Sequence, residues 1–216
     1  MEEAISNGVE QFIILGAGLD TFAFRKPKLV EKLQVFELDH PATQEYKRNR
    51  LKELGWEISD RLHFVPVDFS KDNLSDVIGN SGFDSRKTSF FSWLGVTYYL
   101  ECRHVLSTLK TIADISAPGS IIIYDYLDLD AFDTDKVSQR VKLMQDVVKR
   151  AGEPMLTGFD PVKLQEQLLC VGLQLMEDLA PADIQEAYFK DRTDGYSAFE
   201  HVHFAEASVR ATAKVK

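Results

Sequence analysis

The sequence has little of what marks a secreted, disulfide-stabilised or membrane-spanning protein. It contains only two cysteines, Cys102 and Cys170, which lie far apart and lack the spacing of metal ligands. We therefore expect reduced, packed thiols. No apolar run approaches the length of a membrane span, and residues 1–10 are acidic without the apolar core of an export signal. These absences predict a cytoplasmic protein with no membrane partner.

Basic residues are also few, with 25 Lys and Arg against 34 Asp and Glu and a net charge of −9. Because phosphate backbones attract basic faces, and no stripe of lysine or arginine is present, a nucleic-acid partner is excluded. The chain has 216 residues, 44% of them hydrophobic, without internal repeats or a low-complexity linker. This size predicts one α/β domain over residues 1–216. The oligomeric state is left open.

What the sequence does contain is a strand and a glycine turn over residues 11–25. Phe12 to Leu15 is a short apolar run, Gly16-Ala17-Gly18 interrupts it, and a helix is expected to open near Asp20-Thr21. Glycine allows positive φ angles and close approach of a ligand to the backbone. A helix N-terminus adds free N–H groups facing the same space. The stretch predicts a nucleotide-type pocket, although a tight turn without a ligand would leave the same pattern.

The chain then alternates strands and helices. Apolar runs predict five strands, and segments between them predict helices closed by Gly55, Gly79 and Pro118-Gly119. This repeated order predicts a parallel, doubly wound sheet with right-handed crossovers. Pro66 places the third strand toward a sheet edge. The strands expected are 12–15, 34–38, 62–67, 88–93 and 120–126, and the helices are 41–54, 74–78 and 103–116.

The last third of the sequence departs from this alternation. An amphipathic helix is expected over 136–151, with an apolar stripe formed by Val137, Val141, Met144, Val148 and Ala151. Helices are expected over 161–171 and 181–188, and strands over 173–176 and 199–207. Two late strands with little between them predict a closing pair, one antiparallel to the rest. The fold class is thus α/β, with a doubly wound, mostly parallel seven-stranded Rossmann-like sheet and an antiparallel last strand.

Acidic residues follow the second and third strands at the edge where a doubly wound sheet binds ligands. Asp39, about 20 residues past the glycines, has the spacing at which a carboxylate accepts hydrogen bonds from ribose hydroxyls, and Glu37 is the reserve. Asp68 can accept from the exocyclic amine of a purine, and Phe69 can pack on its ring. Each acid alone fits equally well as a helix cap or loop carboxylate. Together with the turn at 16–18, they predict an adenosine site.

An adenosine site suits both a nicotinamide enzyme and a methyltransferase, and an ordered set of motifs distinguishes them. The runs ILGAGLDTFAFR, VFELDHP, VPVDF, SWLGVTYYL and APGSIIIYDY extend from about Gln11 to Tyr126, and weaker matches continue to Ala207. In this order the sequence resembles the leucine carboxyl methyltransferase-like family of S-adenosylmethionine-dependent methyltransferases, which includes bacterial members of unassigned substrate. The resemblance implies S-adenosyl-L-methionine as the methyl donor.

The resemblance also assigns site residues. By it, the Gly16-Ala17-Gly18 turn lines the methionine portion of the donor, Asp39 its ribose, and Asp68 with Phe69 its adenine. Arg25 matches a family position and orients the site.

Two departures from the family accompany these matches. Leu94 stands where many members have glutamate, and Phe22 where arginine is frequent. Relatives also carry a helical segment before the first strand, which this sequence is expected to lack.

Candidate substrate residues lie in and after the later strands. Tyr98 and Tyr126 are expected to shape an acceptor pocket, and Arg192 is placed to pair with an acidic substrate. A carboxylate acceptor is ionised at neutral pH and needs no general base, which agrees with the lack of an evident base motif. We assign no catalytic residue. His201 and His203 alternate on one strand, but no third ligand accompanies them, so no metal site is predicted.

Three functions remain open. The first is O-methylation of a carboxylate or hydroxyl on a small molecule, or of a C-terminal carboxylate. The second is a catalytically incomplete relative that binds the donor or a partner, suggested by Leu94 and the expected missing segment. The third is a nicotinamide-dependent oxidoreductase, which Thr21 at the third glycine position and the absence of a Tyr-x-x-x-Lys pair disfavour.

Overall fold

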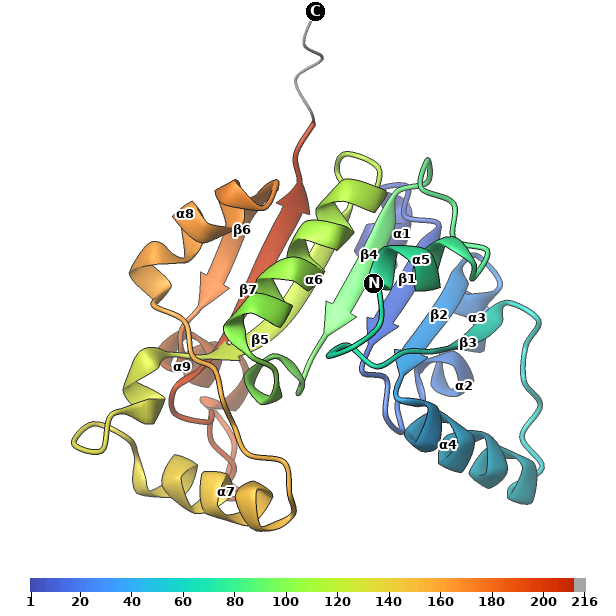
Figure 1. The fold of residues 1–216 in the computed structure, drawn as a ribbon. Helices are drawn as coiled ribbons and strands as arrows, with labels where there is room; N and C mark the ends of the chain where they lie inside the picture. The colour runs from blue at the N-terminus through green and yellow to red at the C-terminus, as the bar shows by residue number, and fades with distance from the viewer. Residues whose placement is uncertain (212–216) are drawn as a thin grey trace, which may run out of the picture.

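A computed structural model describes residues 1–211, which form an α/β fold around one seven-stranded sheet (Figure 1). The strand order is β3-β2-β1-β4-β5-β7-β6. All strands are parallel except β7, which pairs antiparallel with both β5 and β6. The predicted fold class, including the antiparallel last strand, is confirmed. The strands are β1 (Gln11–Leu15), β2 (Gln34–Asp39), β3 (Leu62–Pro66), β4 (Ser89–Trp93), β5 (Ile121–Leu127), β6 (Leu173–Leu179) and β7 (Val202–Val209).

The order of the strands reverses next to β1. The chain moves outward from β1 through β2 to β3, and then returns to the other side of β1 to form β4 and β5. In a doubly wound sheet such a switch point opens a crevice beyond the carboxyl ends of the strands. Pro66 ends β3, which is the edge strand as predicted. The functional site is therefore sought beyond Leu15, Asp39 and Trp93.

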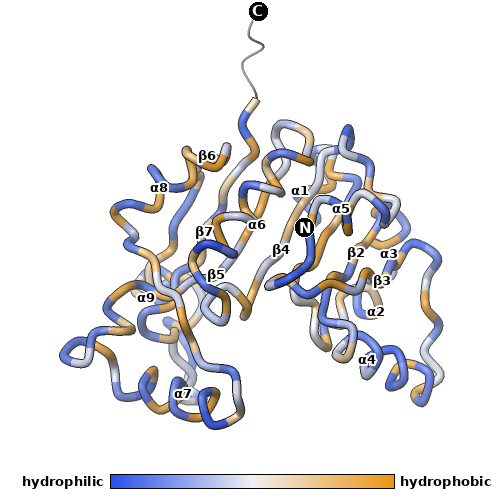
Figure 2. The backbone as a smooth tube through the Cα atoms, viewed as in Figure 1, coloured by the Kyte–Doolittle hydropathy of each residue, from blue (hydrophilic) through white to orange (hydrophobic). Residues whose placement is uncertain are grey.

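Helices cover both faces of the sheet. One face packs against α5, α6 and α8 through a large apolar cluster that includes Leu74, Leu109 and Leu164. The other face packs against α1, α2 and α3 through a smaller cluster that includes Ala4 and Ala23. Figure 2 shows apolar residues concentrated along the strands and a largely hydrophilic α4. The helices are α1 (Glu2–Ser6), α2 (Phe22–Arg25), α3 (Pro27–Val30), α4 (Pro41–Glu53), α5 (Leu74–Gly79), α6 (Cys102–Ile115), α7 (Gln139–Arg150), α8 (Pro161–Cys170) and α9 (Pro181–Ile184).

Several predicted boundaries shift, each for a local reason. The Ser138 side chain accepts a hydrogen bond from Val141 N, so α7 begins three residues later than predicted. His201 has a φ of 66°, which turns the chain and delays β7 to Val202. The helix predicted over 181–188 is instead the short α9 followed by a π turn over Gln185–Phe189.

Two predictions about burial are wrong. Cys102 and Cys170 are free and exposed because they occupy the first residue of α6 and the last of α8, where the helices leave the core. On α7 the predicted apolar stripe is buried only at Val141, and Met144 is 41% exposed. Figure 1 shows the reason, since α7 lies beyond the carboxyl edge of the sheet and not against its face. Among residues 1–211, no helix combines the length and apolar character that crossing a membrane requires.

Candidate functional site

The turn after β1 holds two glycines in the left-handed region, Gly16 at φ 69° and Gly18 at φ 49°. The N–H groups of Gly16 and Ala17 both donate to Leu38 O, at 2.8 and 3.1 Å, so the turn is tied to the end of β2. A Cβ on Gly16 would lie 2.3 Å from Val96 Cγ2, whereas a Cβ on Gly18 would meet nothing within 4 Å. Gly16 is thus required by a packing contact, and Gly18 faces open space.

Asp39, the predicted ribose ligand, closes one side of this turn. Its Oδ2 accepts a hydrogen bond from Gly18 N, and its Oδ1 accepts one from His40 N at 2.6 Å. A carboxylate offers about four acceptor positions, so further hydrogen bonds to a ligand remain available. The structure therefore brings Asp39 and the turn at 16–18 together, as the sequence analysis predicted.

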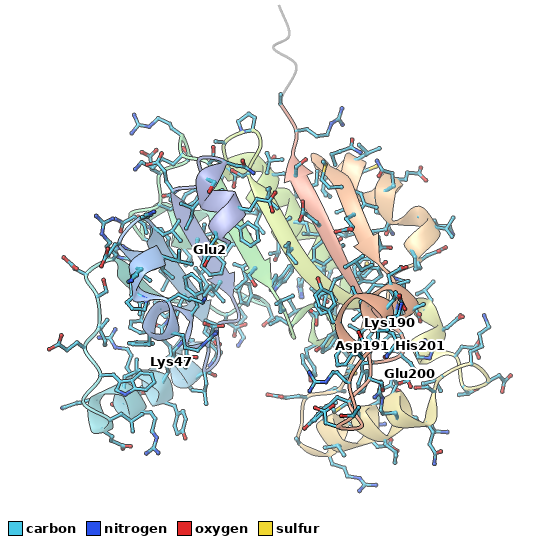
Figure 3. The ribbon with its side chains drawn as sticks, turned by 180° about the vertical axis from the view of Figure 1, so that it is seen from behind. Glu2, Lys47, Lys190, Asp191, Glu200 and His201 are labelled. Atoms are coloured by element: carbon cyan, nitrogen blue, oxygen red, sulfur yellow. The ribbon has the colours of Figure 1, made fainter. Side chains whose placement is uncertain are left out.

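Glu37, the predicted reserve, is withdrawn from this space. Its side chain is 1% exposed and forms an ion pair of 2.5 Å with Lys47, which is itself almost fully buried. Figure 3 shows Lys47 on α4. Burial raises the pKa of the Glu37 carboxyl, and the hydrogen bond from Lys47 opposes that rise. The alternation of strand residues gives the face on which Glu37 lies, but not which helix residue covers it. The sequence alone therefore could not show that Lys47 of α4 pairs with Glu37 of β2. Glu37 acts as a structural partner of Lys47.

Asp68 and Phe69 follow β3, at the same edge of the sheet. The Asp68 carboxylate accepts hydrogen bonds from Ser70 N at 3.0 Å, Ser70 Oγ at 2.6 Å and Lys71 Nζ at 2.6 Å. The hydrogen bonds from Lys71 and Ser70 lower the pKa of Asp68 to about 2, so it is ionised at neutral pH. The Phe69 ring lies 6.1 Å from that of Trp93 and beside a cavity of about 340 Å³ at α5 and α6. This position agrees with a role at the edge of the site.

Arg25 lies on a different surface. It lines a cavity of about 710 Å³ formed by α2, α3 and the segment 56–62, which leads into the amino end of β3. Its Nε donates to Thr21 Oγ1 at 2.8 Å. The predicted role of Arg25 in orienting the site therefore gains no support from its contacts.

Of the three predicted substrate residues, Tyr126 is a core residue. It is fully buried, its OH donates to Asp178 Oδ2 at 2.8 Å, and its ring stacks on His203 with centroids 4.9 Å apart. The prediction that Tyr126 shapes an acceptor pocket is wrong, because the alternation of β5 turns its side chain into the large apolar core, where its ring also lies 6.0 Å from that of Phe159. Burial raises the pKa of its phenol.

Tyr98 and Arg192 have different surroundings. Tyr98 is half-buried in the turn after β4, and burial raises the pKa of its phenol. Arg192 is exposed and already paired, since its Nε donates to Asp194 Oδ1 at 3.0 Å. Its guanidinium also lies 5.2 Å from the ring centroid of Tyr196. The Tyr98 hydroxyl lies near Gly95 in the turn after β4, whereas the charge of Arg192 is matched within its own loop.

The segment after β4 is held by a residue that the sequence analysis did not single out. Asp125, on β5, accepts a hydrogen bond from Gly95 N through Oδ1 at 2.8 Å, and its backbone oxygen accepts one from Thr97 Oγ1 at 2.6 Å. Burial raises the pKa of Asp125 to about 6. The signal in the sequence was a lone acid between two tyrosines inside an apolar strand. Its partner Gly95 is thirty positions away in the chain.

His201 and His203 are linked to acids and not to each other. His201 Nδ1 lies 2.9 Å from Asp128 Oδ1, and His203 lies between Asp128 and Asp178 at 3.7 and 3.5 Å. His201 Nε2 also accepts a hydrogen bond from Ser138 N, which joins the segment before β7 to the start of α7 (Figure 3). Within the described part of the chain, no group of three or more His, Cys, Asp or Glu side chains is arranged to hold a metal ion.

Comparison with known proteins gives a family for this arrangement. The family model described as leucine carboxyl methyltransferase matches residues 1–113, just over half of the chain. A Bacillus subtilis protein, YktD, named provisionally as an S-adenosyl-L-methionine-dependent methyltransferase, is 44% identical over 200 residues. That match covers 93% of this chain and 66% of YktD. The matched part of this chain therefore spans about two thirds of this relative's length.

Solved structures share the fold. The mitomycin 7-O-methyltransferase MmcR aligns with a TM-score of 0.59 at 15% identity, over 96% of this chain and 50% of MmcR. NcsB1, an O-methyltransferase from neocarzinostatin biosynthesis, aligns with a TM-score of 0.56 at 12% identity, over 93% of this chain and 49% of NcsB1. Its structure contains S-adenosyl-L-homocysteine and 1,4-dihydroxy-2-naphthoic acid. At these identities the likeness concerns the fold.

Proposed function

The chain belongs to the leucine carboxyl methyltransferase family, and from this premise we propose that it transfers a methyl group from S-adenosyl-L-methionine to an oxygen atom. The acceptor oxygen belongs to a carboxylate or hydroxyl on a small molecule, or to a C-terminal carboxylate. S-adenosyl-L-methionine is the cofactor named for the relatives, which agrees with the sequence-based prediction. The small-molecule acceptor and the cytoplasmic location stay predictions.

One observation carries the proposal, namely the open turn at Gly18 with the Asp39 carboxylate bound to its N–H. The space above Gly18 lets a ligand approach the backbone, and Asp39 has acceptor capacity for the two hydroxyls of a ribose. The residues present therefore fit an adenosyl group. Phe69 and the Asp68 loop border the same edge, where an adenine would lie. When bound, the donor supplies a methyl group on a positively charged sulfur.

The protein's contribution to such a reaction is mainly positioning. Holding two reactants at near-attack distance can supply roughly 7–11 kcal/mol of the barrier. Val96, packed on Gly16, fixes the turn after β4 against the turn after β1, so both walls of the crevice are set relative to each other. A carboxylate acceptor needs only to be positioned against the donor, whereas a hydroxyl acceptor also needs a group that accepts its proton.

A second candidate function is a donor-binding protein without turnover. It is favoured by Leu94, which is 45% exposed in the turn after β4 and brings no polar group to the site. Donor binding without methyl transfer to any acceptor would support this alternative. The comparisons do not support the hypothesis of a nicotinamide-dependent oxidoreductase, since the relative and the aligned structures described above are all named as methyltransferases.

The test is calorimetric titration of the purified chain with S-adenosyl-L-methionine and with S-adenosyl-L-homocysteine. We expect micromolar binding, about −8 kcal/mol, with at least a tenfold loss in Asp39→Ala because the ribose hydroxyls lose their acceptor. Asp114→Asn is the matched control, since Asp114 pairs with Lys110 on the exposed side of α6. Unchanged affinity in Asp39→Ala would remove Asp39 from the site. No binding by the wild-type chain would contradict the proposed function.

A further inference from the structure

Asp125 occupies a position at the carboxyl edge of the sheet that the donor site does not use. It follows Tyr124, whose register partner on β4 is Trp93, so Asp125 lies opposite the first residues after β4. Its side chain is 7% exposed. Oδ1 accepts the hydrogen bond from Gly95 N at 2.8 Å, and within residues 1–211 no hydrogen bond reaches Oδ2. One carboxylate oxygen is thus free while the other fixes the orientation of the group.

The charge of Asp125 is not matched by a cation. Within the described residues, no lysine, arginine or histidine nitrogen lies within 4 Å of its carboxylate oxygens. The groups that feel its charge are the phenols of Tyr98 and Tyr99, whose pKa values it raises in addition to the effect of burial. A buried carboxyl without a counter-ion binds a proton more readily than one in water. Asp125 is therefore suited to accept a proton near neutral pH.

A cavity of about 380 Å³ adjoins the turn that Asp125 holds. It is lined by Gly95, Tyr99, Gly152, Glu153, Pro154 and Leu156. Its lining contains one acid, Glu153, and no basic residue, and one lining residue, Gly95, is held by Asp125 through its N–H. A carboxylate acceptor entering here would meet the Glu153 carboxylate and no positive group in the lining. A neutral acceptor avoids that repulsion, which costs several kcal/mol for close like charges.

We propose that Asp125 is the general base of the methyl transfer, and that the acceptor is an uncharged hydroxyl compound, a phenol or alcohol, bound in this cavity. This inference rests on the proposed methyltransferase function and narrows its acceptor class. As the acceptor oxygen forms its bond to the methyl carbon, its proton passes to Asp125 Oδ2. The carbon–sulfur bond of the donor breaks, and the electron pair stays on sulfur, which leaves as a neutral thioether. Charge and atoms balance, since the sulfonium cation and the carboxylate are both neutralised.

The experiment compares the wild-type chain with Asp125→Asn, which keeps an oxygen to accept from Gly95 N and removes the base. Donor binding is measured by calorimetry and folding by chemical denaturation. Methyl transfer from labelled S-adenosyl-L-methionine is followed between pH 5 and 9 on two panels, one of phenols and alcohols and one of carboxylic acids. Asp114→Asn again serves as the control.

We expect transfer to members of the hydroxyl panel, with kcat/KM falling as the pH drops through about 6, because the base is then protonated. Asp125→Asn should fold and bind the donor within twofold of wild type, lose about 100-fold or more in kcat, and lose this acidic limb. Unchanged kcat and pH profile in the variant, loss of its donor binding, or transfer only to carboxylic acids would each overturn the inference. Each of these results leaves donor binding by the wild-type chain, and with it the proposed function, intact.

Discussion

Gly16 packs closely against Val96, whereas Gly18 of the same turn faces open space. Substitutions at these two positions therefore distinguish an effect on stability from an effect on ligand binding. Gly16→Ala should destabilise the fold by about 2 kcal/mol or more, because the new Cβ meets Val96 Cγ2 and the φ of 69° disfavours a side chain. Gly18→Ala has the positive φ without the contact, so about 1 kcal/mol is expected. Its Cβ instead enters the open space of the site and should weaken donor binding at least tenfold. Urea denaturation and calorimetry measure the two effects.

A double substitution checks the first half of this argument. Val96→Ala removes the contacting methyl groups, so Gly16→Ala should cost less in that background, with a coupling above about 0.5 kcal/mol. Strictly additive changes would show that Val96 does not explain the glycine. Equal loss of donor affinity in Gly16→Ala and Gly18→Ala, at equal stability, would contradict the assignment of the open space to Gly18.

At the level of single residues, the sequence predicts where a side chain lies along a strand better than what it contacts. Asp39 lies beside the glycine turn, as its spacing from the glycines indicates, because that spacing reflects one βα unit. The surroundings of Glu37 and Tyr126 were not predicted, and Asp125 was not singled out. Each of the three is fixed by a partner on another segment, namely Lys47, Asp178 and Gly95 respectively. Such pairs depend on how the layers are stacked, and no local pattern encodes that.

Among the elements, α7 is attached to the rest of the fold mainly at its first turn. Ser138 caps it, and Arg140 donates to Glu200 Oε2 at 2.8 Å and to Ser197 Oγ at 3.0 Å, with its guanidinium 4.5 Å from the Phe199 ring. Most of its apolar residues are exposed, so little burial opposes local opening. The segment 197–201 and α7 should therefore open together.

Arg140→Ala should speed amide hydrogen exchange across α7 by about tenfold, because roughly 1–2 kcal/mol of anchoring is lost, while the amides of β1 and β4 keep their protection. Arg140→Lys is the matched variant, since it keeps the charge without the planar, two-sided donor group. It should fall between wild type and alanine. Faster exchange in β1 as well would mean that Arg140 supports the whole fold and not this element alone.

Element boundaries show the same limit as the contacts. The apolar runs located all seven strands, because burial in a sheet leaves a periodic trace in the sequence. The starts of α7 and β7 shifted because a side-chain cap at Ser138 and a positive φ at His201 decide them. The burial expected for the apolar stripe on α7 was wrong for a different reason. An amphipathic pattern shows that a helix has an apolar face, but not whether another element packs against that face.

For the whole molecule, the fold class followed from the order of elements along the chain, although that order did not specify the full strand order of the sheet. Five βα units allow few right-handed arrangements, and two closing strands at the end of the chain were enough to predict the antiparallel β7. The family motifs carry the same information, since they occur at successive strand ends. Experiment must show whether ligand binding stabilises the folded sheet as one cooperative unit.

Ligand-linked stability tests that directly. S-adenosyl-L-methionine at 100 times its dissociation constant should raise the free energy of unfolding by about 2.7 kcal/mol, because only the folded sheet brings Gly18 and Asp39 together. For a chain of this size the melting temperature should rise by about 5–10 °C. NADH at the same concentration should leave it unchanged, and Asp39→Ala should lose most of the shift. Stabilisation by NADH and not by S-adenosyl-L-methionine would instead favour a nicotinamide site at the same switch point.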